Sequence, residues 1–267
     1  MKDFKRKYGP WALVTGASSG IGEEFAKQLG KAGLNLILVA RRKNKLDQIK
    51  NRLENRSHIQ VKTVGVDLVQ DGFLDDIRKI TDNLEIGLLV NNAGIWEMGE
   101  YLKIKIEDEI KMMNLNIKAP AILTHHYVPK MVERKKGGII NVASLLAYLG
   151  VPFSAAYAAT KAYELVKGEG LWYELKKKGI DVLSLNPGIT KTEMTTGFDF
   201  SHIPFSSMQP AIVAEAALRA LGKRSQVIPG KFNKLLGILS KRVMTRNMNT
   251  NMFGILMGKA NAKMVKY

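Results

Sequence analysis

The sequence predicts an α/β fold, a doubly wound parallel sheet of six to seven strands with helices on both faces. Three observations support this prediction. Short apolar runs alternate with longer amphipathic segments, a glycine-rich turn follows the first run, and apolar residues are spread along all 267 residues without a linker or repeat. We therefore expect a single domain over residues 1–267, with a core at 11–230 and a C-terminal extension at 231–267.

Seven runs rich in Val, Ile and Leu predict the strands, at residues 11–15, 34–40, 59–67, 87–92, 137–144, 180–187 and 226–230. Continuous apolar runs of this length are typical of strands buried on both faces, as in parallel sheets. Between the first two, residues 22–33 have helical spacing and end in glycine. Between the fifth and sixth, residues 154–178 predict one long helix that ends at Gly179.

Composition excludes several classes of function. The chain has no cysteine, so disulfides, thiolate metal sites and cysteine nucleophiles are excluded. No apolar run approaches the roughly 18 to 20 residues of a spanning helix, and glycines interrupt the apolar segment near the start, which is unlike a signal peptide. His125 and His126 are adjacent without a carboxylate at ligand spacing, so we expect no metal. We expect a cytoplasmic protein that does not bind nucleic acid.

The net charge of +17 is concentrated near the C-terminus. Eleven basic residues and no acidic residue follow Glu215. In the extension, apolar residues at helical spacing alternate with basic ones and predict a basic amphipathic helix; the apolar set is Phe232, Leu235, Leu236, Leu239 and Val243. The pattern leaves three partners open: a second copy in a dimer or tetramer, an anionic membrane surface at which the protein is peripheral, or an acidic acyl carrier.

The turn "TGASSGIG" connects the first strand to the first helix and predicts dinucleotide binding. Glycines there permit a tight turn, close approach of a pyrophosphate and close helix packing, while the helix N-terminus attracts phosphate. Its context after the first strand of a βαβ unit supports this interpretation. The candidate cofactor residues of this turn are Gly16, Ser18, Ser19, Gly20, Ile21 and Gly22.

The end of the second strand favours NADP(H) over NAD(H). An acidic side chain there would accept a hydrogen bond from the adenosine ribose, but this chain has Ala40, followed by Arg41 and Arg42. Arginine suits the 2′-phosphate of NADP. The alternative is that these arginines only form the basic start of a helix and bind no phosphate.

The stretch "SAAYAATKAY" places Tyr157 and Lys161 four residues apart on one helix face. Tyr163 with Lys167, and Tyr173 with Lys177, repeat this spacing. Spacing alone therefore does not distinguish a chemical pair from a solvated helix face.

The motifs "TGASSGIG", "NNAG" (91–94), Ser144, "YAATK" (157–161) and "NPG" (186–188) occur in one order, and the chain resembles the short-chain dehydrogenase/reductase family over roughly residues 11–227. It is most similar in appearance to bacterial NADP-dependent carbonyl and acyl reductases. The resemblance implies a Rossmann-type fold and further cofactor residues: Asp67 and Leu68 beside the adenine, Asn92, Ala93 and Gly94 along the cofactor, and Pro187, Gly188, Ile189, Thr190 and Thr192 near the nicotinamide.

Among the tyrosines, Tyr157 has Ser144 thirteen residues before it, across a strand-to-helix turn. The residue thirteen positions before Tyr163 is Gly150, which has no hydroxyl. The residue thirteen positions before Tyr173 is Thr160, which lies on the same helix roughly 20 Å away at 1.5 Å per residue. Tyr157 is therefore the candidate acid/base. A nearby Lys161, together with the positive charge of the oxidised nicotinamide, is expected to lower the tyrosine pKa, while Ser144 donates to a carbonyl oxygen. The resemblance implies that both Tyr157 and Lys161 contact the cofactor. The resemblance implies a proton relay through Asn116, with Asn114 as the competing choice.

These residues predict an NADP(H)-dependent oxidoreductase that reduces a ketone or aldehyde on an apolar, possibly acyl, substrate by hydride transfer. A regulatory protein that binds NADP without turnover is the alternative. The irregular segment 190–210 carries several apolar side chains and is expected to cover the substrate as a lid, or to pack as an ordinary loop.

Overall fold

A computed structural model of the chain describes residues 3–196 and 207–264. The sheet contains β1 (Trp11–Thr15), β2 (Asn35–Ala40), β3 (Val61–Gly65), β4 (Ile86–Asn91), β5 (Gly137–Val142), β6 (Ile180–Leu185) and β7 (Gln226–Val227). All pairs are parallel, in the order β3-β2-β1-β4-β5-β6-β7. The prediction of a doubly wound sheet is confirmed.

The α-helices are α1 (Phe4–Tyr8), α2 (Gly20–Lys31), α3 (Lys43–Ser57), α4 (Phe73–Thr81), α5 (Ile106–Met113), α6 (Ala119–Glu133), α7 (Ala155–Lys176), α8 (Pro210–Ala220), α9 (Lys231–Arg242) and α10 (Arg246–Met264). Short helical segments are η1 (Tyr101–Lys103), the π-helical η2 (Asn114–Lys118), η3 (Leu145–Tyr148) and η4 (Glu193–Thr195). The predicted long helix is α7, one residue shorter at its start and two at its end. None of the described helices is long and apolar enough to cross a membrane.

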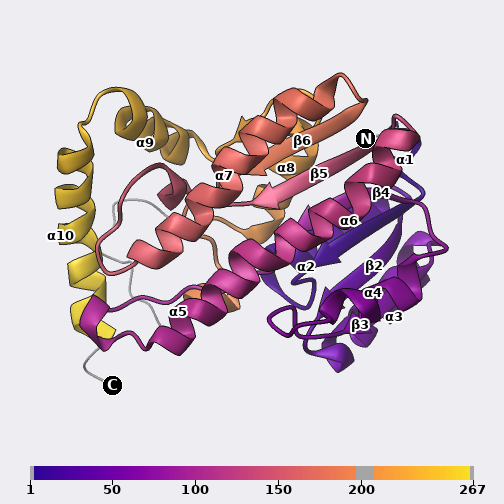
Figure 1. The fold of residues 1–267 in the computed structure, drawn as a ribbon, viewed down its shortest axis with the longest axis horizontal. Coiled ribbons are helices and arrows are strands. Elements are labelled where there is room, and N and C mark those ends of the chain that lie inside the picture. The colour runs from indigo at the N-terminus through magenta and orange to yellow at the C-terminus, as the bar shows by residue number, and fades with distance from the viewer. Residues whose placement is uncertain (1–2, 197–206, 265–267) are drawn as a thin grey trace.

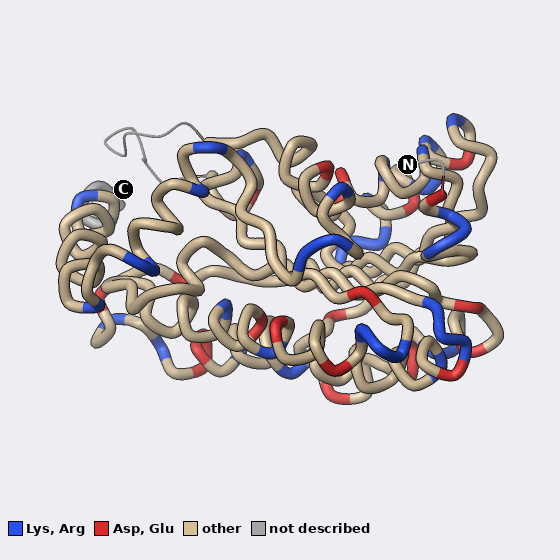
Figure 2. The backbone as a smooth tube through the Cα atoms, turned by 90° about the horizontal axis from the view of Figure 1, so that it is seen from above, with Lys and Arg blue, Asp and Glu red and all other residues tan. Residues whose placement is uncertain are grey.

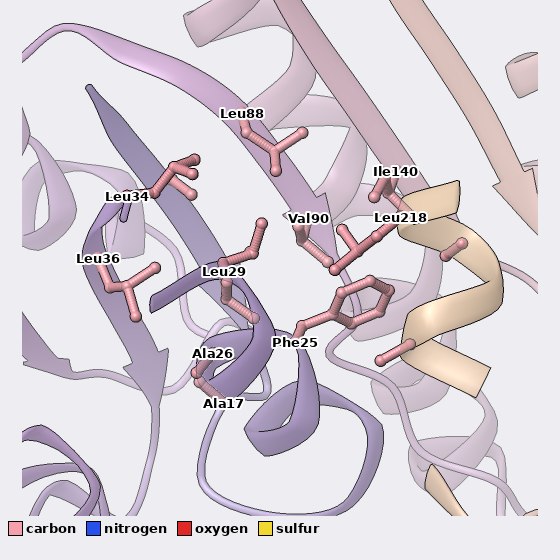
Figure 3. Packing of buried hydrophobic residues seen from close by; sticks show 14 of the residues in the cluster. Ala17, Phe25, Ala26, Leu29, Leu34, Leu36, Leu88, Val90, Ile140 and Leu218 are labelled. Carbon is pink, nitrogen blue, oxygen red and sulfur yellow. The ribbon is translucent and has the colours of Figure 1, made fainter. Parts of the chain in front are cut away.

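Two hydrophobic layers sandwich the sheet, because successive strand residues point to opposite faces. On β1, Val14 packs with α2, α3 and α8, whereas Leu13 packs with α4, α6 and the end of α7. Figure 3 shows the first layer, where Phe25 of α2 lies against Leu218 of α8 below Val90 and Ile140. The two layers make the sheet a rigid support for the loops at its edge.

A third, smaller cluster packs the C-terminal helices against loops of the core. Leu236 of α9 and Phe253 and Met257 of α10 are buried with Leu145 and Val151. Figure 1 shows α9 and α10 at the end of the molecule toward which the arrowhead of β5 points. The extension therefore packs on the core beside the carboxyl ends of the strands, where ligands bind in open α/β sheets. The division into one domain with core 11–230 and extension 231–267 stays a prediction.

Candidate active site

The glycine turn begins where β1 ends, and two of its glycines have a left-handed backbone, Gly16 with φ +64° and Gly20 with φ +58°. At Gly22 the requirement is space, because a Cβ there would lie 2.3 Å from the Gly16 carbonyl oxygen. Ser18 and Ser19 separate these glycines, and α2 starts at Gly20 with its N–H groups at the turn. The turn has the shape of a phosphate cradle, which side chains at these glycines would disrupt.

The end of β4 is tied to this turn. The Thr15 hydroxyl accepts hydrogen bonds from the backbone N–H of Asn92 (2.9 Å) and of Ala93 (3.0 Å), and the Asn92 amide donates to the Thr15 carbonyl (2.9 Å). Strand order reverses between β1 and β4. The "NNAG" segment therefore forms one wall of the crevice at the switch point.

Arg42 links the glycine turn to η4. Its guanidinium donates to the hydroxyls of Ser18 (2.9 Å) and Ser19 (3.1 Å) and lies 2.7 Å from the Glu193 carboxylate. Lys45 contacts the same carboxylate at 2.9 Å, and hydrogen bonds from Lys45 and Arg42 lower the pKa of Glu193 to about 2. Two cations beside the phosphate cradle thus bind one carboxylate of the chain itself.

A cavity of about 570 Å³ extends from this turn to α7 and α10. The predicted site residues that line it are Gly16, Ser18, Ser19, Gly20, Ile21, Arg41, Arg42, Asp67, Leu68, Asn92, Ala93, Gly94, Ser144, Tyr157, Lys161, Pro187, Gly188, Ile189, Thr190 and Thr192. Gly22 and Asn116, which were also predicted, are not among its lining residues. The structure thus gathers into one cavity nearly all the residues that the sequence and the resemblance indicated.

Ser144 and Tyr157 approach each other across the turn between β5 and α7. Ser144 precedes η3, and its hydroxyl oxygen accepts a hydrogen bond from the Leu146 backbone N–H at 3.1 Å. That contact uses an oxygen lone pair, so the hydroxyl proton is free to be donated into the cavity. Burial raises the pKa of Tyr157, and a hydrogen bond with Ser144 acts in the opposite direction. The two hydroxyls can therefore act on the same oxygen atom of a bound molecule.

Lys161 lies beneath the Tyr157 ring, with its Nζ 5.8 Å from the ring centroid. It lowers the pKa of Tyr157, as expected, but burial of the phenol has the larger effect, so the pKa of Tyr157 is raised overall in the chain alone. The expected net decrease also involves the positive charge of an oxidised nicotinamide, so it stays a prediction for the enzyme with its cofactor. Desolvation disfavours tyrosinate more strongly than one lysine favours it.

Asn116 occupies the π-helical segment η2 and is fully buried. Its amide donates to the Ile95 carbonyl (3.0 Å) and to the Thr160 hydroxyl (3.1 Å), and its oxygen accepts from the Ile95 N–H (3.0 Å). Asn116 thus joins the loop after β4 to the turn of α7 between Tyr157 and Lys161. Asn114 begins the same segment and takes part in none of these contacts among the described residues.

The other Tyr/Lys pairs lie on the surface. Tyr163 is 37% exposed with Lys167 over its ring, and Tyr173 is 72% exposed. Tyr157 is 8% exposed and packs against Trp96 with ring centroids 5.7 Å apart. The geometry separates the three pairs that spacing left equivalent.

Sequence reasoning missed the apolar end of the cavity. Trp96, Leu236, Phe253 and Met257 line it beyond Tyr157, and the Trp96 indole donates to the Ser154 hydroxyl at 2.9 Å. Phe253 and Met257 are four residues apart, a helical spacing that indicates one shared face but not what that face contacts.

Glu164 is a second residue that the sequence did not single out. Its carboxylate lies 2.7 Å from the Lys161 ammonium, and the two side chains are 3% and 4% exposed. A Glu three residues after a Lys on a helix is commonly a solvated pair, so its burial could not be read from spacing.

His126 has an acidic neighbour. The His126 Nε2 lies 3.9 Å from an Asp82 carboxylate oxygen, a spatial neighbour that the sequence did not indicate. Within residues 3–196 and 207–264 no group of three potential metal-ligating side chains occurs. Part of the predicted lid, residues 197–206, lies outside the described residues, so the lid stays a prediction.

Comparison with known proteins agrees with this geometry. The family model for short chain dehydrogenases matches residues 10–199. A 7β-hydroxysteroid dehydrogenase of Clostridium sardiniense is 31% identical over 234 residues, 87% of this chain and 90% of the relative. A very-long-chain 3-oxoacyl-CoA reductase of Mus musculus is 32% identical over 265 residues, 98% of this chain and 83% of the relative.

Two solved structures share the fold. One, from work on 7β-hydroxysteroid dehydrogenase stereoselectivity, has a TM-score of 0.86 and 26% identity and covers 94% of this chain and 99% of its own. Another, a short-chain dehydrogenase from Sphingobium yanoikuyae in complex with NADPH, has a TM-score of 0.76 and 30% identity, with coverages of 89% and 97%. With its glycine turn, its Ser/Tyr/Lys cluster and this match over most of its length, the chain belongs to the short-chain dehydrogenase family of oxidoreductases.

Proposed function

We propose that the protein is an NADP(H)-dependent oxidoreductase that reduces a ketone on a bulky, apolar substrate. The observation that carries this proposal is the convergence of Ser144, Tyr157 and Lys161 in one cavity between the glycine turn and an apolar wall. Relatives named for 7β-hydroxysteroids and for very-long-chain 3-oxoacyl-CoA support a large apolar substrate. An NADP-binding regulator without turnover would not need these three side chains together.

In the proposed reaction, Ser144 and Tyr157 hold the carbonyl oxygen. When bound, NADPH supplies the hydride that the carbonyl carbon accepts. The Tyr157 phenol gives its proton to the oxygen, which becomes the alcohol, and Lys161 stabilises the tyrosinate left behind until it regains a proton from solvent. Asn116 keeps the turn of α7 that carries Tyr157 and Lys161 in place, and we assign it the proton relay. The reverse sequence oxidises the alcohol.

Replacement of Tyr157 by Phe tests the proton donor. The ring and its packing on Trp96 remain, so NADPH binding, measured by its fluorescence, should persist. Turnover of a 7-ketosteroid or a 3-oxoacyl thioester, measured by NADPH oxidation, should fall by about 10² to 10⁴. Tyr163→Phe is the matched control, because that tyrosine also has a lysine four residues later but is exposed. Turnover by Tyr157→Phe close to that of Tyr163→Phe would exclude the assignment.

We assign Arg42 and Arg41 to the 2′-phosphate of NADP(H). Arg42 lies beside the serines of the cradle and already binds an anionic group, the Glu193 carboxylate, at 2.7 Å. A phosphate would compete with that carboxylate for Arg42 and Lys45. Because the pKa of Glu193 is held at about 2, the carboxylate remains charged throughout the neutral range.

Two substitutions should then change cofactor affinity in opposite directions. Arg42→Ala should weaken NADPH binding about tenfold or more, and weaken NADH binding less, because charge-assisted hydrogen bonds to the phosphate are lost. Glu193→Gln should tighten NADPH binding by about two- to fivefold, a magnitude typical of exposed ion pairs, and leave NADH unchanged. Dissociation constants from fluorescence titration measure both. Equal losses of NADPH and NADH affinity in Arg42→Ala would show that Arg42 only shapes the turn.

The outer face of α9 carries exposed apolar side chains, which supports a binding partner at this face. Apart from Leu236, the buried residues of this helix are small or polar: Asn233, Gly237 and Ser240. The large apolar side chains are exposed instead, Leu235 to 52%, Ile238 to 42% and Leu239 to 37% of their surface. The predicted apolar stripe is thus divided: Leu236 points inward to the third cluster and lines the cavity, and Val243 beyond the helix is 68% exposed. This distribution is the reverse of an ordinary surface helix.

We assign this face to an anionic lipid surface. Lys231, Lys234 and Arg242 are exposed beside its apolar residues, and Figure 2 shows basic positions in blue along α9 and α10, which contain no acidic residue. A two-fold contact with a second copy would place this basic face against itself. Leu236 of the same helix lines the cavity, so docking would also place one wall of the cavity beside the lipid in which an apolar substrate dissolves. A cytoplasmic location stays a prediction.

Vesicle sedimentation tests this docking. The protein should bind phosphatidylglycerol-containing vesicles at low salt, bind pure phosphatidylcholine vesicles much less, and lose about fivefold in partitioning for each exposed basic residue of α9 replaced. Leu235→Ser with Leu239→Ser should also reduce binding, whereas Leu102→Ser, 94% exposed on η1, should not.

Three outcomes would overturn the assignment of α9 to lipid. They are absence of binding to anionic vesicles, a salt-insensitive dimer in light scattering that Leu235→Asp abolishes, and binding of a purified acyl carrier protein without vesicle binding.

A further inference from the structure

The ion pair between Lys161 and Glu164 is buried inside the enzyme, one helical turn from Tyr157. The Lys161 ammonium donates to the Glu164 carboxylate at 2.7 Å and to the Val142 carbonyl oxygen at 2.8 Å. Removing two charges from water is unfavourable unless they are paired and hydrogen-bonded. The reaction described above uses Lys161 and gives Glu164 no part, so this carboxylate needs an explanation.

We propose that Glu164 is a positioning residue that holds and partly neutralises Lys161 and so opposes ionisation of Tyr157, which favours reduction over oxidation. This inference rests on the proposed function, because it assumes that Tyr157 is the proton donor. It extends that function by assigning to Glu164 an effect on the balance between reduction and oxidation.

The geometry assigns each contact of the lysine. An ammonium has three N–H donors, and Glu164 and Val142 accept two of them. The third has no acceptor among the described residues, and the cavity borders Lys161. Glu164 therefore holds the ammonium against the end of β5 while one N–H is left for a ligand.

The charged groups that act on Tyr157 and Glu164 lie on α7 itself. Lys161 lowers the pKa of Tyr157 and Glu164 raises it. Burial raises the pKa of Glu164 to about 7 against the lowering effects of Lys161 and Lys167, so this carboxylate is charged at alkaline pH, where a phenol ionises. The neighbouring elements contribute uncharged groups: Ser144 before η3, Asn116 in η2 and the Val142 carbonyl in β5. Glu164 is thus the carboxylate that opposes the effect of Lys161 on the phenol.

Reduction and oxidation depend on pH in opposite ways, because they use opposite protonation states of Tyr157. Reduction requires the protonated phenol and declines as pH rises through the pKa of Tyr157. Oxidation requires tyrosinate and increases through the same pKa. Loss of the Glu164 charge would leave the field of Lys161 uncompensated and lower that pKa. Both pH profiles should therefore move to lower pH.

The test is Glu164→Gln, with kcat/KM measured against pH in both directions using a 7-ketosteroid and its alcohol. Each profile should shift by about one pH unit to lower pH, a size expected for one charge a few ångströms away. Oxidation at about pH 9, where Glu164 is charged in the wild type, should rise by up to about tenfold. Glu169→Gln, which removes one charge five residues further along α7, should leave both profiles unchanged.

Glu164→Asp provides a second variant, because loss of a buried partner can prevent folding. It retains the charge but withdraws it from the ammonium, and should cause a smaller shift in the same direction. A folded Glu164→Gln with unshifted or alkaline-shifted profiles would overturn the inference, as would an unshifted Glu164→Asp if the glutamine variant does not fold.

A readout without turnover separates this inference from the proposed function. In protein labelled with ¹³C at the tyrosine Cζ, with the Tyr157 signal assigned through Tyr157→Phe, titration should show Tyr157 ionising at lower pH in Glu164→Gln than in the wild type. Failure of the wild type to turn over any ketone would refute the proposed function. An unchanged Tyr157 titration in a folded variant would refute the role of Glu164.

Discussion

The close packing of the glycine turn against the end of β4 is the constraint on which the rest of the site depends. A Cβ at Gly22 would lie 2.3 Å from the Gly16 carbonyl oxygen and 2.5 Å from the Asn92 amide, and Gly16 also needs a left-handed backbone. Because these positions lack side chains, Thr15 can bind the "NNAG" segment through its hydroxyl. That contact holds the segment as one wall of the crevice at the switch point. Ile95, which follows the segment, is hydrogen-bonded to Asn116, and Asn116 is hydrogen-bonded to Thr160 of α7.

The site combines two parts of different origin. The cofactor end and the Ser/Tyr/Lys cluster rest on β1, β4, β5 and α7, which the two main hydrophobic layers hold rigidly. The apolar end rests on α9 and α10, which the smaller third cluster attaches. Catalytic groups need precise placement, whereas an apolar wall needs shape and hydrophobicity. Under the proposed function, the rigid core would carry the hydride chemistry and the C-terminal helices would select the substrate.

Local sequence signals predicted the sheet, the glycine turn and the position of Tyr157, because each depends on periodicity or on short-range geometry. Long-range partners were not predictable. Spacing on α9 grouped Leu236 with Leu235, yet the fold turns Leu236 inward. Nothing in the sequence shows that Glu193 pairs with Arg42 over 151 residues (193 − 42), or that burial outweighs Lys161 in setting the pKa of Tyr157. Such effects arise from desolvation and tertiary contact, which a sequence pattern does not contain.

We propose that this cavity transfers hydride to a ketone, with Tyr157 as the proton donor. The most direct measurement uses NADPH deuterated at the transferable C4 position, a 7-ketosteroid or 3-oxoacyl thioester, and mass spectrometry of the product. We expect one deuterium at the carbinol carbon for each NADPH consumed, with the hydroxyl proton derived from solvent. NADPH that binds in the cavity but is not consumed with any ketone, or a product without deuterium at that carbon, would contradict it.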